Sequence, residues 1–346
     1  MSIFEKWTGP VLMGGVAAVG IGSAVIAEWR FDRPFADGAT QQSWQGQFDD
    51  ALVIGDPSIM AWGTVFWDLF GQTSAGAVAG ADGWLFTDEE YVATDGYHER
   101  LDARIAEIVA TRAELSGQGI EVIIALLPDK ARIMPEMVTR PRPAIVEERY
   151  DVLLSRLGDA GADVLDLRPA LTEAKQAGPV FLRTDTHWTP FGAQTVAAAI
   201  APHIKALTDA SDDFETEQLE TVMHQGDLMA FLPVSEKRAA AFGEQPLAQF
   251  VTVSTSQDLF GGDALFGDAP QLGTLIGTSF SANANWHFEG WLKQESGLDI
   301  LNLADEGQGP FAPMRAFLAD ADAVTETTAG VVIWEIPERY VTLDDQ

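Results

Sequence analysis

The chain has 346 residues, of which 47% are hydrophobic, enough for one large globular domain or two smaller ones. It contains no cysteine, which excludes disulfides, thiolate nucleophiles and cysteine-ligated zinc. Its net charge of −31 argues against binding nucleic acid, because phosphate backbones are bound by basic surfaces.

An uncharged segment near the N-terminus is typical of a membrane helix. Residues 7–27 are 21 positions without a charge between Lys6 and Glu28, and that length spans a hydrocarbon core. We expect a single transmembrane anchor within residues 1–35, followed by an exported domain over residues 36–346. The small residues that precede Glu28 leave a cleaved signal peptide as the alternative.

Helices and strands alternate along the rest of the chain. The pattern predicts a short strand after the turn "GADGWLF" at 80–86, helices over about 101–115, 144–157, 191–206 and 282–294, and strands over 121–128, 162–167, 273–277, 298–303 and 330–336. Such alternation predicts an α/β fold with a mostly parallel sheet covered by helices on both faces. The acid-rich segment 207–270 is expected to be an insertion on this core.

The stretch "RTDTHWTPFGA" at 183–193 carries the strongest local signal for chemistry. Asp185 and His187 are two residues apart, so they point to the same side of an extended chain. A carboxylate placed there would fix the tautomer of the imidazole and stabilise its protonated form. The alternatives are a capping aspartate beside a structural histidine, or a pair of metal ligands.

A second signal is Ser279, at the point where an apolar strand enters a Gly-Thr-Ser turn before a helix. This position exposes a hydroxyl at the carboxyl edge of the sheet, where open α/β sheets bind ligands. The competing interpretation is a helix cap, because serine is favoured there. Ser281 is a rival nucleophile that lies further into the turn.

Five histidines compete for the role of base. His287 is eight residues beyond Ser279, roughly 12 Å along a helix, and therefore cannot reach it. The sequence places the others in no comparable polar cluster, which leaves His187; these others are His98, His203 and His224.

Basic residues gather after the strand at 121–128. Lys130 and Arg132, with Arg140 and Arg142, form the densest basic patch of an acidic chain. They could grip an anionic sugar, or they could form ion pairs with nearby acids. Gly307 and Gly309 follow a later strand, where backbone N–H groups can approach a ligand closely.

Taken together, these pieces resemble the alginate O-acetyltransferase family of AlgX/AlgJ type, whose members have an SGNH-hydrolase-like, flavodoxin-like fold with circularly permuted motif order. The matching stretches are "GADGWLF", "LLPDKARIMPE", "RTDTHWTPFGA", "GDLM", "GTSFSAN" and "VIWEIPERY". The specific element is "DTHWT" followed by "GTSFS" about ninety residues later, the reverse of the order in ordinary SGNH enzymes.

The resemblance implies a catalytic triad of Ser279 as nucleophile, His187 as base and Asp185 as the residue that orients the base. It implies an oxyanion site formed by the backbone of Ser279 with Gly307 or Gly309, and no metal or cofactor. Candidate substrate contacts are Lys130, Arg132, Asn283, Arg339 and Tyr340.

The function implied is transfer of an acetyl group through an acetyl-serine intermediate to hydroxyls of an exopolysaccharide, alginate-like or cellulose-like, in the periplasm. The expected partners are the polysaccharide acceptor, a membrane-bound O-acyltransferase that delivers acetyl, and the inner membrane through the N-terminal segment. Three alternatives remain: a secreted carbohydrate acetylesterase with the same triad, a non-catalytic polysaccharide-binding or assembly protein, and an Asp/His metal site.

Overall fold

The computed structural model describes residues 73, 75–162, 164–232, 242–255 and 271–343. Nearly all of them belong to one compact unit, formed by Ala75–Phe231 and Phe242–Gln346. Among these residues no helix is both long and apolar enough to cross a bilayer. The predicted anchor at 7–27 lies outside the described residues, so the boundaries at 35/36 and around 207–270 stay predictions.

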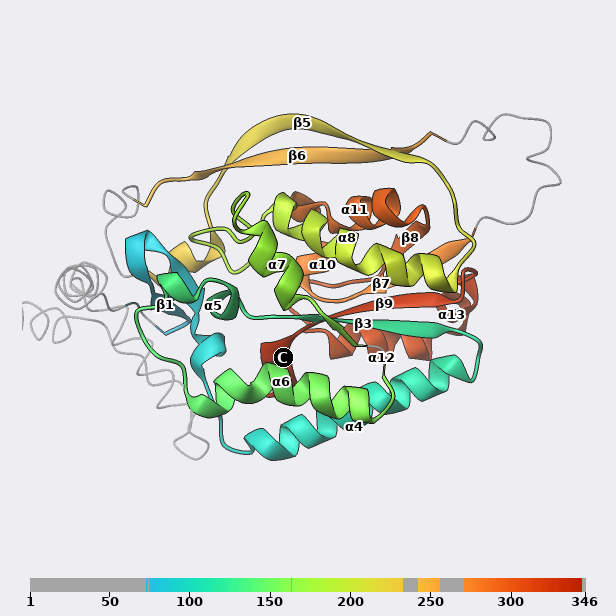
Figure 1. Cartoon of the computed structure of the whole chain (residues 1–346), viewed down its shortest axis with the longest axis horizontal. Coiled ribbons are helices and arrows are strands. Elements are labelled where there is room, and N and C mark those ends of the chain that lie inside the picture. The colour runs from blue at the N-terminus through green and yellow to red at the C-terminus, as the bar shows by residue number, and fades with distance from the viewer. Residues whose placement is uncertain (1–72, 74, 163, 233–241, 256–270, 344–346) are drawn as a thin grey trace, which may run out of the picture. The chain divides into compact units, whose positions relative to one another are not determined.

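A parallel sheet of five strands forms the centre of the unit (Figure 1). All of its strand pairs are parallel, which confirms the sheet expected from the alternation of elements. Its inner strands are continuous apolar runs because both faces are covered. The strands are β3 Glu121–Leu127, β4 Val164–Asp166, β7 Leu272–Ile276, β8 Asp299–Asn302 and β9 Val331–Pro337.

The strand order is β4-β3-β9-β7-β8. If β7 is numbered 1 and the numbering continues through β8, β9, β3 and β4, the order across the sheet, read from β8, is 2-1-3-4-5. This is the flavodoxin-like order. The strand that precedes Ser279 thus takes the place of the first strand of such a sheet, although it comes third in this chain. The arrangement is what a circular permutation produces.

Helices cover both faces of the sheet (Figure 1). Alternate residues of β9 face the two layers: Val331 and Ile333 belong to one core cluster, and Val332 and Trp334 to the other. One layer holds α7 Arg168–Ala174, α8 Pro190–Leu207, α10 Ser279–Ala282 and α11 Phe288–Ser296. The other holds α4 Tyr97–Ser116, α6 Ala144–Asp159, α12 Phe311–Ala319 and α13 Ala321–Glu326.

Two antiparallel pairs lie outside the central sheet. Residues 80–84 form the turn between β1 Ala77–Ala79 and β2 Leu85–Thr87, so the stretch "GADGWLF" contains both the turn and the start of the predicted strand. Within 207–270, where the sequence predicted no strands, β5 Phe214–His224 pairs with β6 Gln245–Ser254. This ribbon passes over α11, where the Thr216 N–H donates to Gln294 Oε1 at 2.9 Å (Figure 1). Its strands alternate less clearly than buried ones because most of their residues are exposed.

The helix predicted over 282–294 is broken into three pieces, which corrects the sequence analysis. Between α10 and α11 lies the short helix η7 Ala284–Trp286, and His287 turns the chain with a left-handed φ of 57°. The remaining short elements are η1 Ala81–Gly83, η2 Asp88–Tyr91, α5 Lys130–Ile133, η3 Pro135–Met137, η4 Asp227–Phe231 and η8 Glu338–Val341.

Candidate active site

Asp185 and His187 lie in a closed loop before α8. An isolated bridge between Phe181 and Trp188 closes the loop, where the Leu182 N–H donates to the His187 carbonyl at 3.1 Å. Thr189 caps α8 by accepting the Gly192 N–H at 3.0 Å. The two residues therefore lie on a constrained, bent loop before α8, and not in an extended segment as expected.

Ser279 is the first residue of α10, directly after β7 and the Gly277-Thr278 turn. The cap of this helix is Thr278, whose hydroxyl accepts the Phe280 N–H at 3.3 Å. The alternative that Ser279 is only a helix cap is therefore wrong. Its hydroxyl is left to make a different contact.

That contact is with His187. Ser279 Oγ lies 2.7 Å from His187 Nε2, and His187 Nδ1 lies 2.7 Å from Asp185 Oδ1. The His187 backbone N–H also donates to Asp185 Oδ1, at 2.9 Å. The fold thus joins three side chains, two of them about ninety residues from the third in sequence, into one chain of hydrogen bonds.

A second histidine reaches the same carboxylate. His224 Nε2 lies 2.8 Å from Asp185 Oδ2, and the Asp227 backbone N–H donates to the same oxygen at 3.1 Å. The sequence analysis placed His224 in no polar cluster, and this was wrong. It missed the contact because the 207–270 segment showed no strand that would bring His224 to the site; "HQGDL" at 224–228, beside the family stretch "GDLM", was the available signal.

The two imidazoles determine the charge of Asp185, which is 2% exposed. Burial opposes ionisation of this carboxyl, but hydrogen bonds from His187 and His224 outweigh it and hold the pKa of Asp185 well below its ordinary value. The same contact raises the pKa of His224, partly offset by burial. The carboxylate is therefore an anion that both rings share.

Aromatic rings fix the orientation of the His187 imidazole. Trp286 stacks on it at 5.0 Å between ring centroids and 22° between planes, and Phe280 packs beside it at 4.7 Å. Trp286 Nε1 donates to the Ser279 carbonyl at 3.2 Å, so one side chain contacts both ends of the histidine–serine pair. No sequence pattern pointed to Trp286.

The two rival residues are engaged elsewhere. Ser281 is 2% exposed and donates from Oγ to Glu335 Oε2 at 3.1 Å. His287 Nε2 lies 2.7 Å from Thr252 Oγ1. Neither one takes part in the hydrogen bonds between His187 and Ser279.

Lys130 does not line a substrate groove, which corrects its assignment as a substrate contact. It is 1% exposed, and its ammonium group donates to three carbonyls, those of Leu85, Arg183 and Asp185. Burial lowers the pKa of Lys130 to about 7, against the attraction of Glu90 and Asp185. Three acceptors match the three N–H groups of an ammonium ion. Lys130 therefore connects the chain segment at Leu85 to the segment that carries Asp185.

Of the arginines in the predicted basic patch, Arg140 is exposed, whereas Arg132 and Arg142 are engaged in ion pairs within the protein. Arg132 pairs with Glu338 at 2.7 Å, and Arg142, which is 7% exposed, pairs with Asp129 at 3.0 Å. Arg339, 4% exposed, donates to Glu89 at 2.9 Å. The assignment of Arg132 and Arg339 to substrate contact is corrected accordingly, because both guanidinium groups are already paired with carboxylates of the protein.

Gly307 and Gly309 lie in the loop after β8, both with left-handed φ angles, of 74° and 63°. This loop runs beside the serine turn, because the Asp305 N–H donates to the Gly277 carbonyl at 3.3 Å. Gly309 faces the ring of Tyr340, which is half-buried. The structure therefore brings the loop to the correct edge of the sheet, and the oxyanion role stays a prediction.

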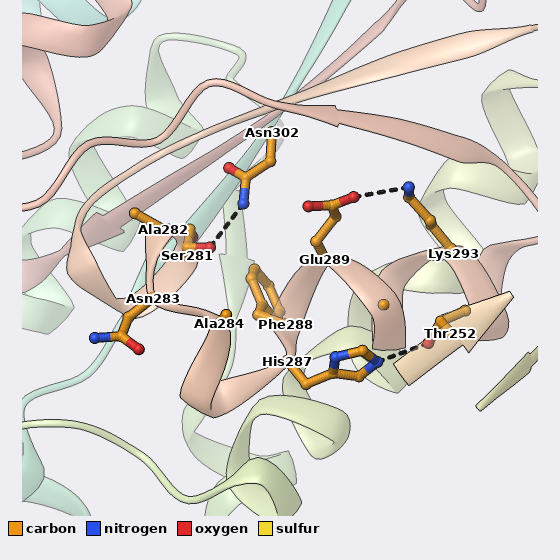
Figure 2. A pocket seen from close by; sticks show the side chains of 11 residues that line it. Thr252, Ser281, Ala282, Asn283, Ala284, His287, Phe288, Glu289, Lys293 and Asn302 are labelled. Carbon is orange, nitrogen blue, oxygen red and sulfur yellow. Dashed lines mark hydrogen bonds and ion pairs between the residues drawn. The ribbon is translucent and has the colours of Figure 1, made fainter. Parts of the chain in front are cut away.

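Asn283 lines a pocket of about 160 Å³ that begins two residues beyond Ser279 (Figure 2). Its walls combine amide, hydroxyl, imidazole and aromatic groups, and its charged pair, Lys293 and Glu289, is joined at 2.7 Å. The residues that line it are Thr252, Ser281, Ala282, Asn283, Ala284, His287, Phe288, Glu289, Gly290, Lys293 and Asn302.

Part of this arrangement is also a candidate metal cluster. Asp185, His187 and Asp227 bring potential ligand atoms within 4.8 Å of one another. Both oxygens of Asp185 already accept hydrogen bonds from an imidazole and from a backbone N–H. Since these donors occupy the carboxylate that would bind a cation, the cluster is better suited to proton transfer than to metal binding.

Comparison with known proteins identifies the family of the chain. The family model described as "SGNH hydrolase-like domain, acetyltransferase AlgX" matches residues 77–338. The probable alginate O-acetylase AlgJ of Pseudomonas aeruginosa is 37% identical over 325 residues, covering 90% of this chain and 82% of that protein.

Two solved structures have the same fold. The O-acetyltransferase domain of Pseudomonas putida AlgJ superposes with a TM-score of 0.69 at 32% identity, covering 78% of this chain and 94% of that one. Pseudomonas aeruginosa AlgX gives a TM-score of 0.57 at 25% identity, covering 78% of this chain and 63% of that one. The chain therefore belongs to the AlgX family of SGNH-hydrolase-like acetyltransferase domains, in which AlgJ proteins are among its relatives.

Proposed function

We propose that this protein is a periplasmic O-acetyltransferase that carries an acetyl group on Ser279 and transfers it to hydroxyls of an exopolysaccharide. The observation that carries the proposal is the position of His187, 2.7 Å from both Ser279 Oγ and Asp185 Oδ1. The names of the relatives, probable alginate O-acetylases, supply the group transferred and the class of acceptor.

The first half-reaction loads the serine. Asp185 accepts the Nδ1–H of His187, so that Nε2 carries the lone pair that takes the Ser279 proton. Ser279 Oγ attacks the acetyl carbonyl of the donor, and the backbone N–H of Ser279, with Gly307 or Gly309, would hold the oxyanion. His187 then returns the proton to the leaving group, and acetyl-Ser279 remains.

The second half-reaction transfers the acetyl group from Ser279 to the sugar. A sugar hydroxyl takes the place of the departed group, His187 removes its proton, and the sugar oxygen attacks the acetyl-serine carbonyl. Collapse of the tetrahedral intermediate breaks the bond to Ser279 Oγ, which recovers its proton from His187. The acceptor ends as an acetyl ester, and the enzyme returns to its starting state.

We place the acceptor sugar in the pocket of Figure 2, whose lining begins at Ser281, two residues beyond Ser279. Asn283 and Thr252 offer neutral polar groups that match sugar hydroxyls, whereas the ring of Phe288 is 1% exposed and packs against Trp188. The proposed acceptor is an alginate-like or cellulose-like chain. Because Lys130 and Arg132 are committed to internal contacts, they do not supply the positive charge that a polyanion would need.

We place the protein on the periplasmic side of the inner membrane, held there by the uncharged segment at residues 7–27. The acetyl donor would be supplied by a membrane-bound O-acyltransferase. The N-terminal anchor would keep the acetyltransferase domain close to such a partner.

The decisive experiment traps the intermediate. The full chain is mixed with a chromogenic acetyl ester, quenched and digested, and the peptide that contains Ser279 is examined by mass spectrometry. We expect an added acetyl group on Ser279 and a loss of ester turnover of roughly 10⁴-fold in Ser279→Ala. The matched control is Ser155→Ala, on the exposed side of α6, which should turn over normally.

Three results would contradict the proposal. Full turnover by Ser279→Ala would exclude the serine as nucleophile. Ester hydrolysis that no oligosaccharide acceptor diverts into acetylated sugar would favour the carbohydrate acetylesterase instead. Activity that is lost to a chelator and restored by a divalent cation would support a metal at Asp185, His187 and Asp227.

A further inference from the structure

His224 is the last residue of β5, and this strand brings its side chain to the candidate active site. Its Nε2 lies 2.8 Å from Asp185 Oδ2, the oxygen that His187 does not use. The rings of His224 and Trp286 lie in a T-shaped arrangement, 5.6 Å between centroids and 88° between planes, and Trp286 also stacks on His187. His224 is thus fixed by the same indole that fixes the base.

The turn after His224 also contacts the loop that carries Asp185. The Asp227 N–H donates to Asp185 Oδ2 at 3.1 Å, and Asp227 Oδ1 accepts the Thr186 N–H at 2.8 Å. Gly226 lies against the Thr184 carbonyl so closely that a Cβ would overlap it. The segment 224–227 therefore touches the side chain and the backbone of the loop that carries the base.

We propose that His224 is a positioning residue for the acetyl-transfer reaction: it holds the Asp185 carboxylate from the side opposite His187, and it controls with its own charge how readily His187 is protonated. The inference rests on the proposed function, since it assigns His187 as the base.

The tautomers follow from the carboxylate between the rings. An ionised carboxylate only accepts hydrogen bonds, so His187 must carry its hydrogen on Nδ1 and His224 must carry one on Nε2. His187 Nε2 is thereby the acceptor for the Ser279 hydroxyl. His224 can take up a second proton on Nδ1 without losing its bond to Asp185.

The charged groups that face His224 are Asp185 and Asp227, and His187 lies across the shared carboxylate. Asp227 Oδ2 also lies 3.8 Å from His187 Nδ1. Both acids favour a positive His224. A proton on His224 places a positive charge near His187 and so opposes protonation of the base.

Two substitutions in the full chain separate these contributions. His224→Phe keeps a ring against Trp286 but removes the donor, and His224→Gln keeps a donor that cannot be protonated. We expect His224→Phe to lower kcat for a chromogenic acetyl ester about ten- to one hundred-fold, with KM little changed, because a hydrogen bond to a charged group is lost. His224→Gln should recover most of that loss.

The pH profile gives the readout that a purely structural role would not move. The acid limb of kcat/KM should lie at higher pH in His224→Gln than in the wild type, because glutamine cannot oppose protonation of His187. The matched control is His98→Gln, on the exposed side of α4, whose profile should superimpose on the wild type.

Wild-type kcat in His224→Phe, or an acid limb in His224→Gln that is unmoved or lies at lower pH, would overturn the inference. Ser279→Ala, measured in the same assay, separates this failure from failure of the proposed function. If Ser279→Ala is inactive while both His224 variants behave as wild type, only the role of His224 is lost. If Ser279→Ala is active, the proposed function itself is lost.

Discussion

The Glu335 carboxylate lies beneath the turn that presents Ser279, and its Oε2 accepts the Thr278 backbone N–H at 2.7 Å. The same oxygen accepts the hydroxyls of Thr278 at 3.0 Å and Ser281 at 3.1 Å. Gly277 makes this approach possible, since a Cβ there would lie 2.5 Å from Glu335 Oε2. One buried acid thus holds the residues on both sides of Ser279.

Replacing Glu335 with alanine should therefore loosen the serine turn. The Thr278 N–H would be left buried without an acceptor, at a cost of about 1–3 kcal/mol in the free energy of unfolding. We expect a lower Tm and a kcat for ester turnover that falls more than KM rises. Glu326→Ala, an exposed change on α13, is the control. Unchanged kcat in a folded Glu335→Ala would show that this carboxylate does not position Ser279.

The acidity of Glu335 predicts a dependence of stability on pH. Burial raises the pKa of Glu335 above its ordinary 4.5, and the hydrogen bonds from Thr278 and Ser281 offset only part of this. A raised carboxyl pKa stabilises the fold below the unfolded value and loses that contribution as pH rises through the folded value. The glutamine in Glu335→Gln does not ionise, so the variant keeps its stability over this pH range. The Tm of Glu335→Gln minus that of the wild type should therefore increase as the pH rises above 4.5. A Tm difference that is independent of pH would contradict this.

Much of the central fold could be predicted because its signals are local. The apolar run of β3 and the helical spacing of α4 are legible in sequence, and both elements were placed within a few residues. The position of Ser279 between a strand and a helix was legible for the same reason. Such patterns reflect burial of one element against its neighbours.

The parts that could not be predicted depend on contacts between distant segments. His224 and Trp286 reach the site only because the β5–β6 ribbon and the break at His287 place them there. Lys130 and Arg132 were misjudged because their partners, the Asp185 carbonyl and Glu338, lie far away in sequence. A basic residue in an acidic chain has the same sequence signal whether its partner is a ligand or a buried acid.

Lys130 offers a direct test of that correction. Lys130→Met removes the donor to three buried carbonyls, so we expect a loss of about 2–5 kcal/mol in unfolding free energy, measured with denaturant. Lys205→Met, on the exposed side of α8, should leave stability within about 0.5 kcal/mol. If Lys130→Met were as stable as the wild type and only raised KM for an anionic oligosaccharide, the lysine would be a substrate contact after all.

Gly226 should not tolerate a side chain. A Cβ would overlap the Thr184 carbonyl and lie 2.6 Å from the Asp185 nitrogen, so Gly226→Ala must push the 224–227 turn away from the loop that carries Asp185. We expect a lower Tm together with a lower kcat. Gly158→Ala is the control, because a Cβ at that position meets nothing within 4 Å. Normal kinetics in Gly226→Ala would mean that the turn can retreat without disturbing the carboxylate.

The pocket of Figure 2 can be tested by filling it. Ala284 lines the pocket and its side chain makes no hydrogen bond, so Ala284→Trp adds bulk without removing a polar contact. If the pocket holds the acceptor sugar, this change should raise KM for an oligosaccharide acceptor about tenfold or more, while hydrolysis of a small acetyl ester stays normal. Ala110→Trp, on the exposed side of α4, should alter neither reaction. If KM for the oligosaccharide acceptor is unchanged in Ala284→Trp, the acceptor binds on another surface beside Ser279, because a sugar bound in the pocket would have to compete with the indole for the same space.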